Sequence, residues 1–450
     1  MELAKFREKV FDRAKAEGFT DMELYHNSAD RLQLRVFGGE VDSYTLSQEG
    51  GWSFRGVYNG KVGYSYTEVA DEDSVEMLVR DSRENAQVID SDEVIEIFAG
   101  SDKYPEFEGV SAALAAVEPE EKIEFAKALE AAALAADPRV KAANMCIFAS
   151  ADDTVNIQNS KGLDLSYRHN GAYFYISVMV QEGQDTKTFG RFESTRDLKQ
   201  ADPAAVAGKA VKEALGLLGA DTMDSGSYPV VLRWEAATTL LGAFSGVFSA
   251  ENVQKNMSLL KGKLGEQVAA AAVTIVDDPL LPAGLYSSPF DAEGVATKTK
   301  TVVDSGKLAT YLHNLKTAAK DGVESTGNAS KASYNSSVAV APSNMFIQAG
   351  EEGLEEMIAG IDRGVVVVDV QGAHSGANPV SGDFSLGAFG YLVENGKVVR
   401  PVNQITIAGN FLEMLQDVQK VGNDLNFGMP MGSLIGSPSL LIGDLSVSGK

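Results

Sequence analysis

The chain has 450 residues, 44% of them hydrophobic, so it is long enough for two or three domains and can bury a core. Its net charge is −24, from 39 basic and 63 acidic residues, and a surface this negative repels phosphate backbones and anionic lipids. No run of Lys or Arg supplies a basic patch, which argues against direct binding to nucleic acid or membranes.

The sequence predicts a soluble cytoplasmic protein. The N-terminus carries charges from the start, and no stretch approaches the roughly 18 uninterrupted apolar residues of a membrane span. The single cysteine, Cys146, lies in an apolar run and is interpreted as a buried core thiol rather than a nucleophile. Nothing in the cysteine usage indicates an oxidising compartment.

A first unit of helix, strands and helix is predicted near the N-terminus. Apolar residues recur at helical spacing up to Gly18, and residues 32–36 alternate as in a half-buried strand. Asn59-Gly60 between two apolar segments predicts a hairpin turn. A second helix is expected after residues 71–74, whose acidic and serine side chains can cap it.

The same order of elements is predicted to repeat after a polar linker at residues 99–109. The expected elements are a helix opening at Pro119, strands at 140–148, 154–157 and 173–180, and an Ala-rich helix at 203–218. Two such units suggest a repeat, and we expect the two to face one another.

From about Gly226 the sequence changes to short β-type segments separated by glycine turns, with glycines clustered from Gly372 to Gly396. We therefore predict an α+β protein with an N-terminal α+β domain (1–108), a central α+β domain (109–222) and a large β-rich C-terminal domain (223–450). One inserted helical stretch is expected in the last domain.

Five sequence blocks of the C-terminal region, in this order and spacing, resemble the TldD/PmbA family, whose members are also called modulators of DNA gyrase. They begin with the helix-like segment Arg233-Trp234-Glu235-Ala236-Ala237-Thr238-Thr239. The others are Phe290-Asp291-Ala292-Glu293-Gly294, Asn378-Pro379-Val380-Ser381-Gly382-Asp383, Gly390-Tyr391-Leu392-Val393-Glu394-Asn395-Gly396 and Val421-Gly422-Asn423-Asp424. The resemblance covers nearly the whole chain.

The resemblance implies a two-part zinc peptidase. One subunit type, TldD, carries His-Glu-x-x-x-His on a helix and a Cys near the C-terminus, which together hold zinc. The other type, PmbA or TldE, lacks these residues and pairs with the first.

This sequence departs from the zinc pattern at each ligand position. Trp234 and Thr239 stand in place of the two histidines, and Met431 stands in place of the cysteine, while Glu235 remains at the position of the general base. A catalytic zinc needs about three ligands from His, Asp, Glu or Cys and one open position for water. We therefore expect no metal and no cofactor in this chain, with zinc in the partner subunit.

Other residues offer only weak alternatives. The histidines never occur at ligand spacing: His26 and His313 are interpreted as structural, His169 as a strand surface residue, and His374 lies in a Gly-rich loop. Asp277-Asp278, and Asp291 with Glu293, are compatible with a carboxylate pair but are typical of turns. Candidates for a peptide channel are His374, Asn378, Gly382 and Asp383.

The first hypothesis is therefore a non-catalytic PmbA/TldE-like subunit of a cytoplasmic zinc peptidase. It would pair with a TldD-like subunit, form a homodimer when alone, and admit unfolded or extended peptides. A second hypothesis is a stand-alone peptidase or hydrolase with an unrecognised site near Glu235 or His374. A third, a regulator that contacts DNA, is disfavoured by the net charge.

Overall fold

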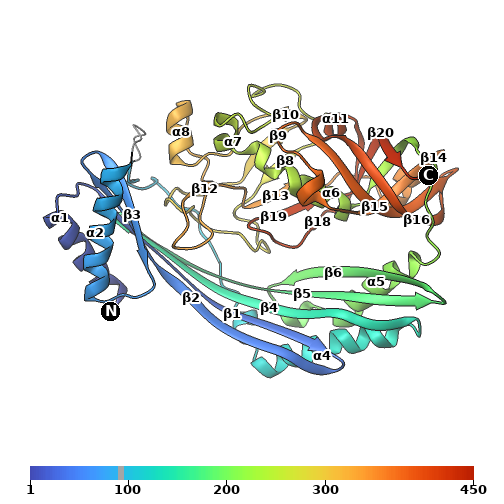
Figure 1. The fold of residues 1–450 in the computed structure, drawn as a ribbon, viewed down its shortest axis with the longest axis horizontal. Helices are drawn as coiled ribbons and strands as arrows, with labels where there is room; N and C mark the ends of the chain where they lie inside the picture. Colours follow the sequence, from blue (N-terminus) through green and yellow to red (C-terminus); the bar gives the residue numbers. More distant parts are fainter. Residues whose placement is uncertain (90–95) are drawn as a thin grey trace.

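The computed structural model describes residues 1–89 and 96–450. Its N-terminal half is built around one long, curved antiparallel sheet with the strand order β3-β2-β1-β4-β5-β6 (Figure 1). The strands are β1 (Met22–Phe37), β2 (Glu40–Tyr58), β3 (Lys61–Thr67), β4 (Val140–Asn159), β5 (Asp164–Glu182) and β6 (Asp185–Thr195).

The two predicted helix–strands–helix units are present, but they do not face one another. Their strands join edge to edge, because β1 pairs with β4 from Glu23↔Asn159 to Arg35↔Ile147. The predicted hairpin at Asn59-Gly60 is confirmed: both residues have positive φ, which the tight turn between β2 and β3 requires.

Helices at the two ends of this sheet bury its apolar face. Near the N-terminus, α1 (Leu3–Ala16) and α2 (Glu72–Val88) enclose a cluster that includes Phe6, Phe54 and Leu78. As predicted, the Asp71 side chain caps α2 by accepting a hydrogen bond from the Ser74 N–H at 2.8 Å.

The central helices cover the other part of the sheet. They are α3 (Ala112–Ala115), α4 (Pro119–Ala136), the short 3₁₀ turn Leu198–Gln200 and α5 (Pro203–Gly216). Their core contains Phe125, Phe148, Phe174 and Cys146, which is fully buried as predicted. Val368 of the C-terminal region belongs to the same cluster, so the central and C-terminal parts share packing.

The C-terminal region contains two larger sheets and one two-stranded ladder. The first sheet has the order β16-β15-β14-β7-β20-β17, and β16 also pairs with β20, so this sheet curls back on itself. The second has the order β10-β9-β8-β13-β19-β18, and β11 pairs with β12. The strands are β7 (Gly226–Leu232), β8 (Ile275–Asp277), β9 (Lys300–Asp304), β10 (Lys307–Leu308), β11 (Ala329–Ser330), β12 (Ala339–Val340), β13 (Asn344–Ile347), β14 (Arg363–Gln371), β15 (Asp383–Glu394), β16 (Lys397–Asn410), β17 (Val418–Val421), β18 (Asn426–Phe427), β19 (Leu434–Ser437) and β20 (Leu440–Ser448).

This β-rich region contains several short helices, whereas the sequence predicted a single helical stretch. They are α6 (Trp234–Phe244), a 3₁₀ turn (Ser245–Phe248), α7 (Ala250–Gln254), α8 (Leu315–Asp321), α9 (Leu354–Ala359), α10 (Ala373–Gly376) and α11 (Phe411–Gln416). The apolar helix α6 packs against β14 and β19, and Phe244 near its C-terminal end stacks on Phe411 of α11. None of the helices in the described residues has the length and apolar character needed to span a bilayer.

Candidate functional site

A cavity of about 290 Å³ lies at the N-terminal end of α6. Its wall contains Trp234, Glu235 and Thr239, three of the four positions singled out from the sequence. The polypeptide leaves β7 at Leu232, and the Arg233 N–H is held by the Val367 carbonyl of β14 at 2.9 Å. The helix therefore starts beside the sheet and presents its first turn to the cavity.

A buried network fixes the start of the helix. The Trp234 N–H donates to Ser439 Oγ at 3.1 Å, and Ser439 Oγ donates to Asp424 Oδ2 at 2.7 Å. One of the otherwise unpaired N–H groups of the first helical turn is thereby satisfied by a side chain. Asp424, one of the residues in the sequence blocks, thus positions α6 and stays outside the cavity wall.

Two arginines hold Glu235. Arg233 binds the carboxylate bidentately, with Nε to Oε2 and Nη2 to Oε1 both at 2.7 Å. Arg191 of β6 adds an Nη1–Oε1 contact at 3.4 Å, and its guanidinium lies 4.9 Å above the Trp234 ring. Arg233 also binds Glu213 of α5 at 2.7 Å. The positive charge beside the Glu235 carboxylate is therefore supplied by the guanidinium groups of Arg233 and Arg191.

The electrostatics of this cluster are those of an ion-paired structural site. Burial raises the pKa of Glu235, while Arg233 and Arg191 oppose that rise. Both carboxylate oxygens accept guanidinium N–H groups, so Glu235 is not free to orient a water molecule. Asp369 of β14 lies in the same wall, and burial raises its pKa to about 6.

The fourth position, Met431, is not part of this cavity. It lies in the loop between β18 and β19, its side chain is 89% exposed, and it belongs to the wall of a larger cleft. The structure thus brings Trp234, Glu235 and Thr239 together and places Met431 elsewhere.

The larger cleft has a volume of about 870 Å³ and lies where the long N-terminal sheet meets the loops of the C-terminal region. Strands β1, β4 and β5 form one wall. The opposite wall comes from segments 279–297, 327–343 and 430–433. Charged residues on both sides include Arg31, Asp153, Asp291 and Lys331. The cleft thus lies between the two halves of the chain and is lined by both polar and apolar groups.

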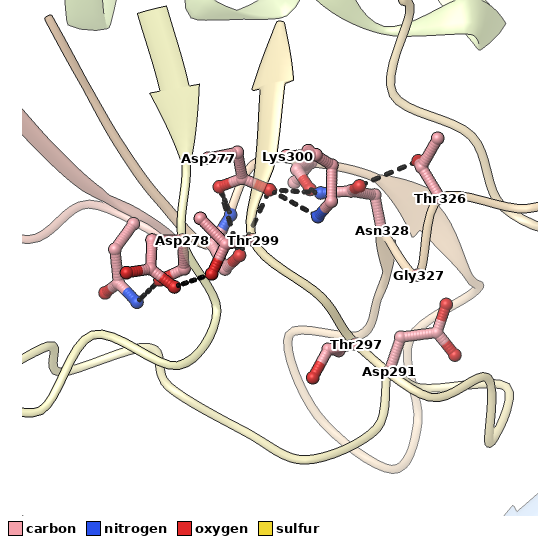
Figure 2. A network of polar contacts seen from close by, with 12 residues as sticks. Asp277, Asp278, Asp291, Thr297, Thr299, Lys300, Thr326, Gly327 and Asn328 are labelled. Carbon is pink, nitrogen blue, oxygen red and sulfur yellow. Dashed lines mark hydrogen bonds and ion pairs between the residues drawn. The ribbon is translucent and has the colours of Figure 1, made fainter. Parts of the chain in front are cut away.

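The acidic pairs considered as catalytic candidates are structural. Asp277 is fully buried and accepts hydrogen bonds from Lys300 Nζ, Asn328 Nδ2 and Ser343, and Figure 2 shows the first two converging on one oxygen. Asp291 accepts the backbone N–H groups of Glu293, Val295 and Ala329 at 2.9–3.0 Å. Asp291 thus shapes its own loop, as expected, whereas Asp277 is the last residue of β8 and pairs with the buried Lys300.

Comparisons with known proteins agree with this architecture. The model of the PmbA/TldA metallopeptidase domain 1 matches residues 22–86, and those of the central and C-terminal domains match residues 113–218 and 225–449. The chain belongs to the PmbA/TldD family. Its resemblance in the sequence blocks is therefore confirmed over most of its length.

Individual relatives are similar to most of the chain. Metalloprotease PmbA of Escherichia coli O157:H7 is 31% identical over 341 residues, covering 75% of this chain and 71% of the relative. A crystal structure from Thermotoga maritima, named as a modulator of a DNA gyrase, has a TM-score of 0.92 at 35% identity and covers 99% of this chain and all of that one. TldE from Thermococcus kodakarensis shares the fold, with a TM-score of 0.90 at 23% identity over 99% of this chain and 100% of its own.

The residues of the α6 cavity do not fit the zinc of the family's catalytic type. Indole and hydroxyl groups stand at positions 234 and 239, and two arginines supply positive charge beside Glu235. Among residues 1–89 and 96–450, no three His, Cys, Asp or Glu side chains gather closely enough to hold a metal ion.

The peptide-channel candidates lie apart from both cavities. His374 is exposed on α10, and Asn378, Gly382 and Asp383 form a loop closed by its own hydrogen bonds, such as Gly382 N–H to the Asn378 carbonyl at 2.8 Å. None of the four is in the wall of either cavity. A channel role for them stays a prediction.

Sequence reasoning misplaced one histidine and missed several site residues. His169 is buried and lies in the cleft wall, not on the strand surface, because Phe107 stacks on it at 6.2 Å. Arg191, Arg233 and Asp369 were not selected from the sequence. Arg233 directly precedes the Trp234-Glu235 pair, so a basic residue at the helix start was the available signal.

Proposed function

We propose that this chain is the non-catalytic, PmbA/TldE-type subunit of a cytoplasmic zinc metallopeptidase complex. It pairs with a TldD-like subunit that supplies the zinc site, and the complex cleaves unfolded or extended peptides. When alone, the chain forms a homodimer.

The bidentate Arg233–Glu235 pair carries this proposal. A peptidase base must contact a metal-activated water, and in this chain that carboxylate is neutralised by guanidinium groups. Trp234 stands at one of the ligand positions, and its indole ring lies 4.9 Å from the Arg191 guanidinium. The membership in a metallopeptidase family supports a peptidase-linked role, and the large cleft offers room for an extended chain.

The first prediction concerns metal and activity. The purified chain is expected to bind no stoichiometric zinc and to leave an unfolded protein substrate intact, as measured by elemental analysis and a casein-type assay. The Trp234→His and Thr239→His double variant is expected to remain inactive, because Met431 is outside the cavity and Arg233 still holds Glu235.

About one zinc per wild-type chain after purification without chelators, or hydrolysis of the substrate by the chain alone, would instead support the stand-alone hydrolase. Peptidase activity of the double variant further distinguishes the subunit hypothesis from the stand-alone hydrolase hypothesis. Robust turnover would show that the rest of a catalytic site is intact.

The second prediction concerns pairing. The chain is expected to pair through its C-terminal domain. In this domain the apolar residues Val398 and Val399 of β16 are 47% and 48% exposed to solvent. Val398→Glu is expected to weaken both homodimer and heterodimer at least about tenfold, measured by light scattering with size exclusion. Leu46→Glu on the N-terminal hairpin, where Leu46 is 68% exposed, is the matched control and is expected to leave pairing unchanged.

A chain that is monomeric at micromolar concentration and does not bind an added His-containing relative contradicts the subunit role.

The terminal run around Leu440 and Ile442 is not available for pairing, since both side chains are buried in the core as β20 crosses the sheet.

A further inference from the structure

The wall of the α6 cavity contains a carboxylate that no cation of the described residues pairs with. This carboxylate belongs to Asp369 of β14. Among residues 1–89 and 96–450, no Lys, Arg or His forms an ion pair with it. Arg233 attracts Asp369 from a longer distance, but its guanidinium is bound to Glu213 and Glu235. A desolvated charge of this kind is costly unless a counter-charge accompanies it.

A β-bulge directs Asp369 toward the cavity. Side chains of a regular strand alternate between its two faces, but the register of β14 with β15 shifts between Val367 and Asp369. Val367 and Val370 both belong to the C-terminal core, whereas Val368 packs into the central core. The extra residue thus allows Asp369 to share the cavity wall with Tyr175 of β5. Bulges near sites commonly re-aim one side chain in this way.

The Asp369 carboxyl is charged near neutral pH. Burial raises its pKa to about 6, while the Val370 N–H, Arg233 and Thr239 oppose that rise. At a pH of about 7.5 the carboxylate form therefore dominates. A ligand that enters the cavity meets a negative charge there.

The rest of the wall suits an organic cation. Its charged residues are Arg191, Glu235 and Asp369, so the wall carries a net charge of −1. Its aromatic residues are Tyr175, Phe189, Phe192, Trp234, Phe389 and Phe427. The face of an aromatic ring attracts cations, and the Arg191 guanidinium already lies 4.9 Å from the centre of the Trp234 ring.

A buried hydroxyl in the same wall lacks a partner. Thr238 is 6% exposed, and its Oγ1 makes no hydrogen bond to the described residues. Buried polar atoms nearly always have a partner, so a ligand with N–H donors would satisfy this oxygen. Arg191 Nε is also without a hydrogen bond to the described residues, but the charge of Arg191 is balanced by Glu193 and Glu235. An anionic ligand therefore finds no uncompensated cation in this wall.

We propose that the α6 cavity binds a primary alkylammonium group, with Asp369 as its counter-ion and the aromatic rings around its methylene chain. The ammonium has three N–H donors, which can serve the Asp369 carboxylate and the Thr238 hydroxyl. The volume of about 290 Å³ has room for a chain as long as a lysine side chain. A free alkylamine and a lysine of an extended peptide both present this group. The inference goes beyond the proposed subunit role, because binding by the chain alone requires neither zinc nor a partner.

Tryptophan fluorescence tests the proposal on the full chain. The protein has two tryptophans, and only Trp234 lines this cavity, so Trp52→Phe leaves Trp234 as the reporter. Titration with n-butylammonium at a pH of about 7.5 is expected to change its emission and to saturate. The uncharged n-butanol and the anion butyrate are expected to bind at least about tenfold more weakly.

A blocked tripeptide with a central lysine, compared with its norleucine analogue, distinguishes the two sources of the ammonium. Binding of the lysine peptide at least as tight as that of butylammonium identifies a peptide side chain as the ligand. Binding of butylammonium but not of the peptide identifies a free amine. Both results support the proposal.

Two substitutions in the Trp52→Phe chain locate the site, with circular dichroism as the check on folding. Asp369→Asn is expected to weaken butylammonium binding at least about tenfold, whereas Asp362→Asn, at an exposed residue just before β14, is expected to leave it unchanged. Should Asp369→Asn not fold, Thr238→Val removes only the hydroxyl and is expected to weaken binding about threefold to tenfold. Equal binding of butanol and butylammonium, tighter binding of butyrate, or full affinity in a folded Asp369→Asn chain overturns the proposal.

Discussion

Replacing Arg55 by methionine is expected to lower the free energy of unfolding by about 3–5 kcal/mol. Arg55 of β2 is buried, with Nη2 2.7 Å from Glu23 Oε1 of β1 and Nη1 3.4 Å from Glu293 Oε1 of the C-terminal region. Glu23 and Glu293 are also buried. Without the guanidinium, two carboxylates remain in a dry site with no cation between them, and the link between the two halves is lost.

Urea unfolding of the Arg55→Met variant measures this loss, and Arg31→Met on the same sheet is the control. Arg31 pairs with Asp153 at 3.2 Å, but its side chain is 47% exposed, so its removal is expected to cost under about 1 kcal/mol. Similar losses in the two variants would contradict the role given to burial.

The loss in free energy of unfolding caused by Arg55→Met is also expected to depend on pH. Burial raises the pKa of Glu23, and Arg55 opposes that rise, so the variant's Glu23 has a still higher folded pKa. A carboxyl whose pKa is higher in the folded than in the unfolded state binds more protons when folded, so lowering the pH favours folding. The difference between variant and wild type should therefore shrink from pH 8 to pH 5.

Local features of the fold were predictable from the sequence, whereas the joining of the two N-terminal units was not. The Asn59-Gly60 turn and the Asp71 cap depend on neighbouring residues and are confirmed. The β1–β4 pairing connects distant segments, and periodicity carries no information about such partners.

Strand β4 illustrates the same limit. Its sequence predicts two strands separated by a polar stretch, because Asp152 and Asp153 interrupt the apolar pattern. In the structure the strand continues through both residues. Arg168 of β5 pairs with Asp152, and Arg31 of β1 pairs with Asp153, so neighbouring strands compensate the two charges.

The candidate site likewise has residues that the sequence locates and residues that only the folded structure brings to it. Trp234, Glu235 and Thr239 lie within one helical segment, so the sequence pattern was enough to locate them together. Arg191 and Asp369 reach the same cavity from β6 and β14, which only the folded arrangement reveals.

Replacing Asp277 by leucine is expected to destabilise the C-terminal domain by about 3–5 kcal/mol. Asp277 ends β8, is fully buried, and gathers Lys300 Nζ at 3.0 Å, Asn328 Nδ2 at 2.7 Å and the Ser343 N–H at 2.8 Å (Figure 2). These donors come from β9 and from the segments beside β11 and β13, so one carboxylate ties together four parts of the chain. Its removal leaves Lys300, which is 8% exposed, as a buried cation without a partner.

Two further variants separate the buried charge from mere loss of packing. Asp278→Asn changes the neighbouring half-buried carboxylate, which accepts from Thr299 Oγ1 at 2.7 Å and the Leu280 N–H at 3.0 Å, and is expected to cost about 1 kcal/mol. Asp277→Leu combined with Lys300→Met removes both charges and is expected to recover part of the loss, because no unpaired ion remains. Thermal and urea unfolding of the wild type, Asp277→Leu, Lys300→Met alone and the double variant give the four values of the Asp277–Lys300 double-mutant cycle. Additive losses would show that the pair is energetically uncoupled and that the other Asp277 hydrogen bonds account for its contribution.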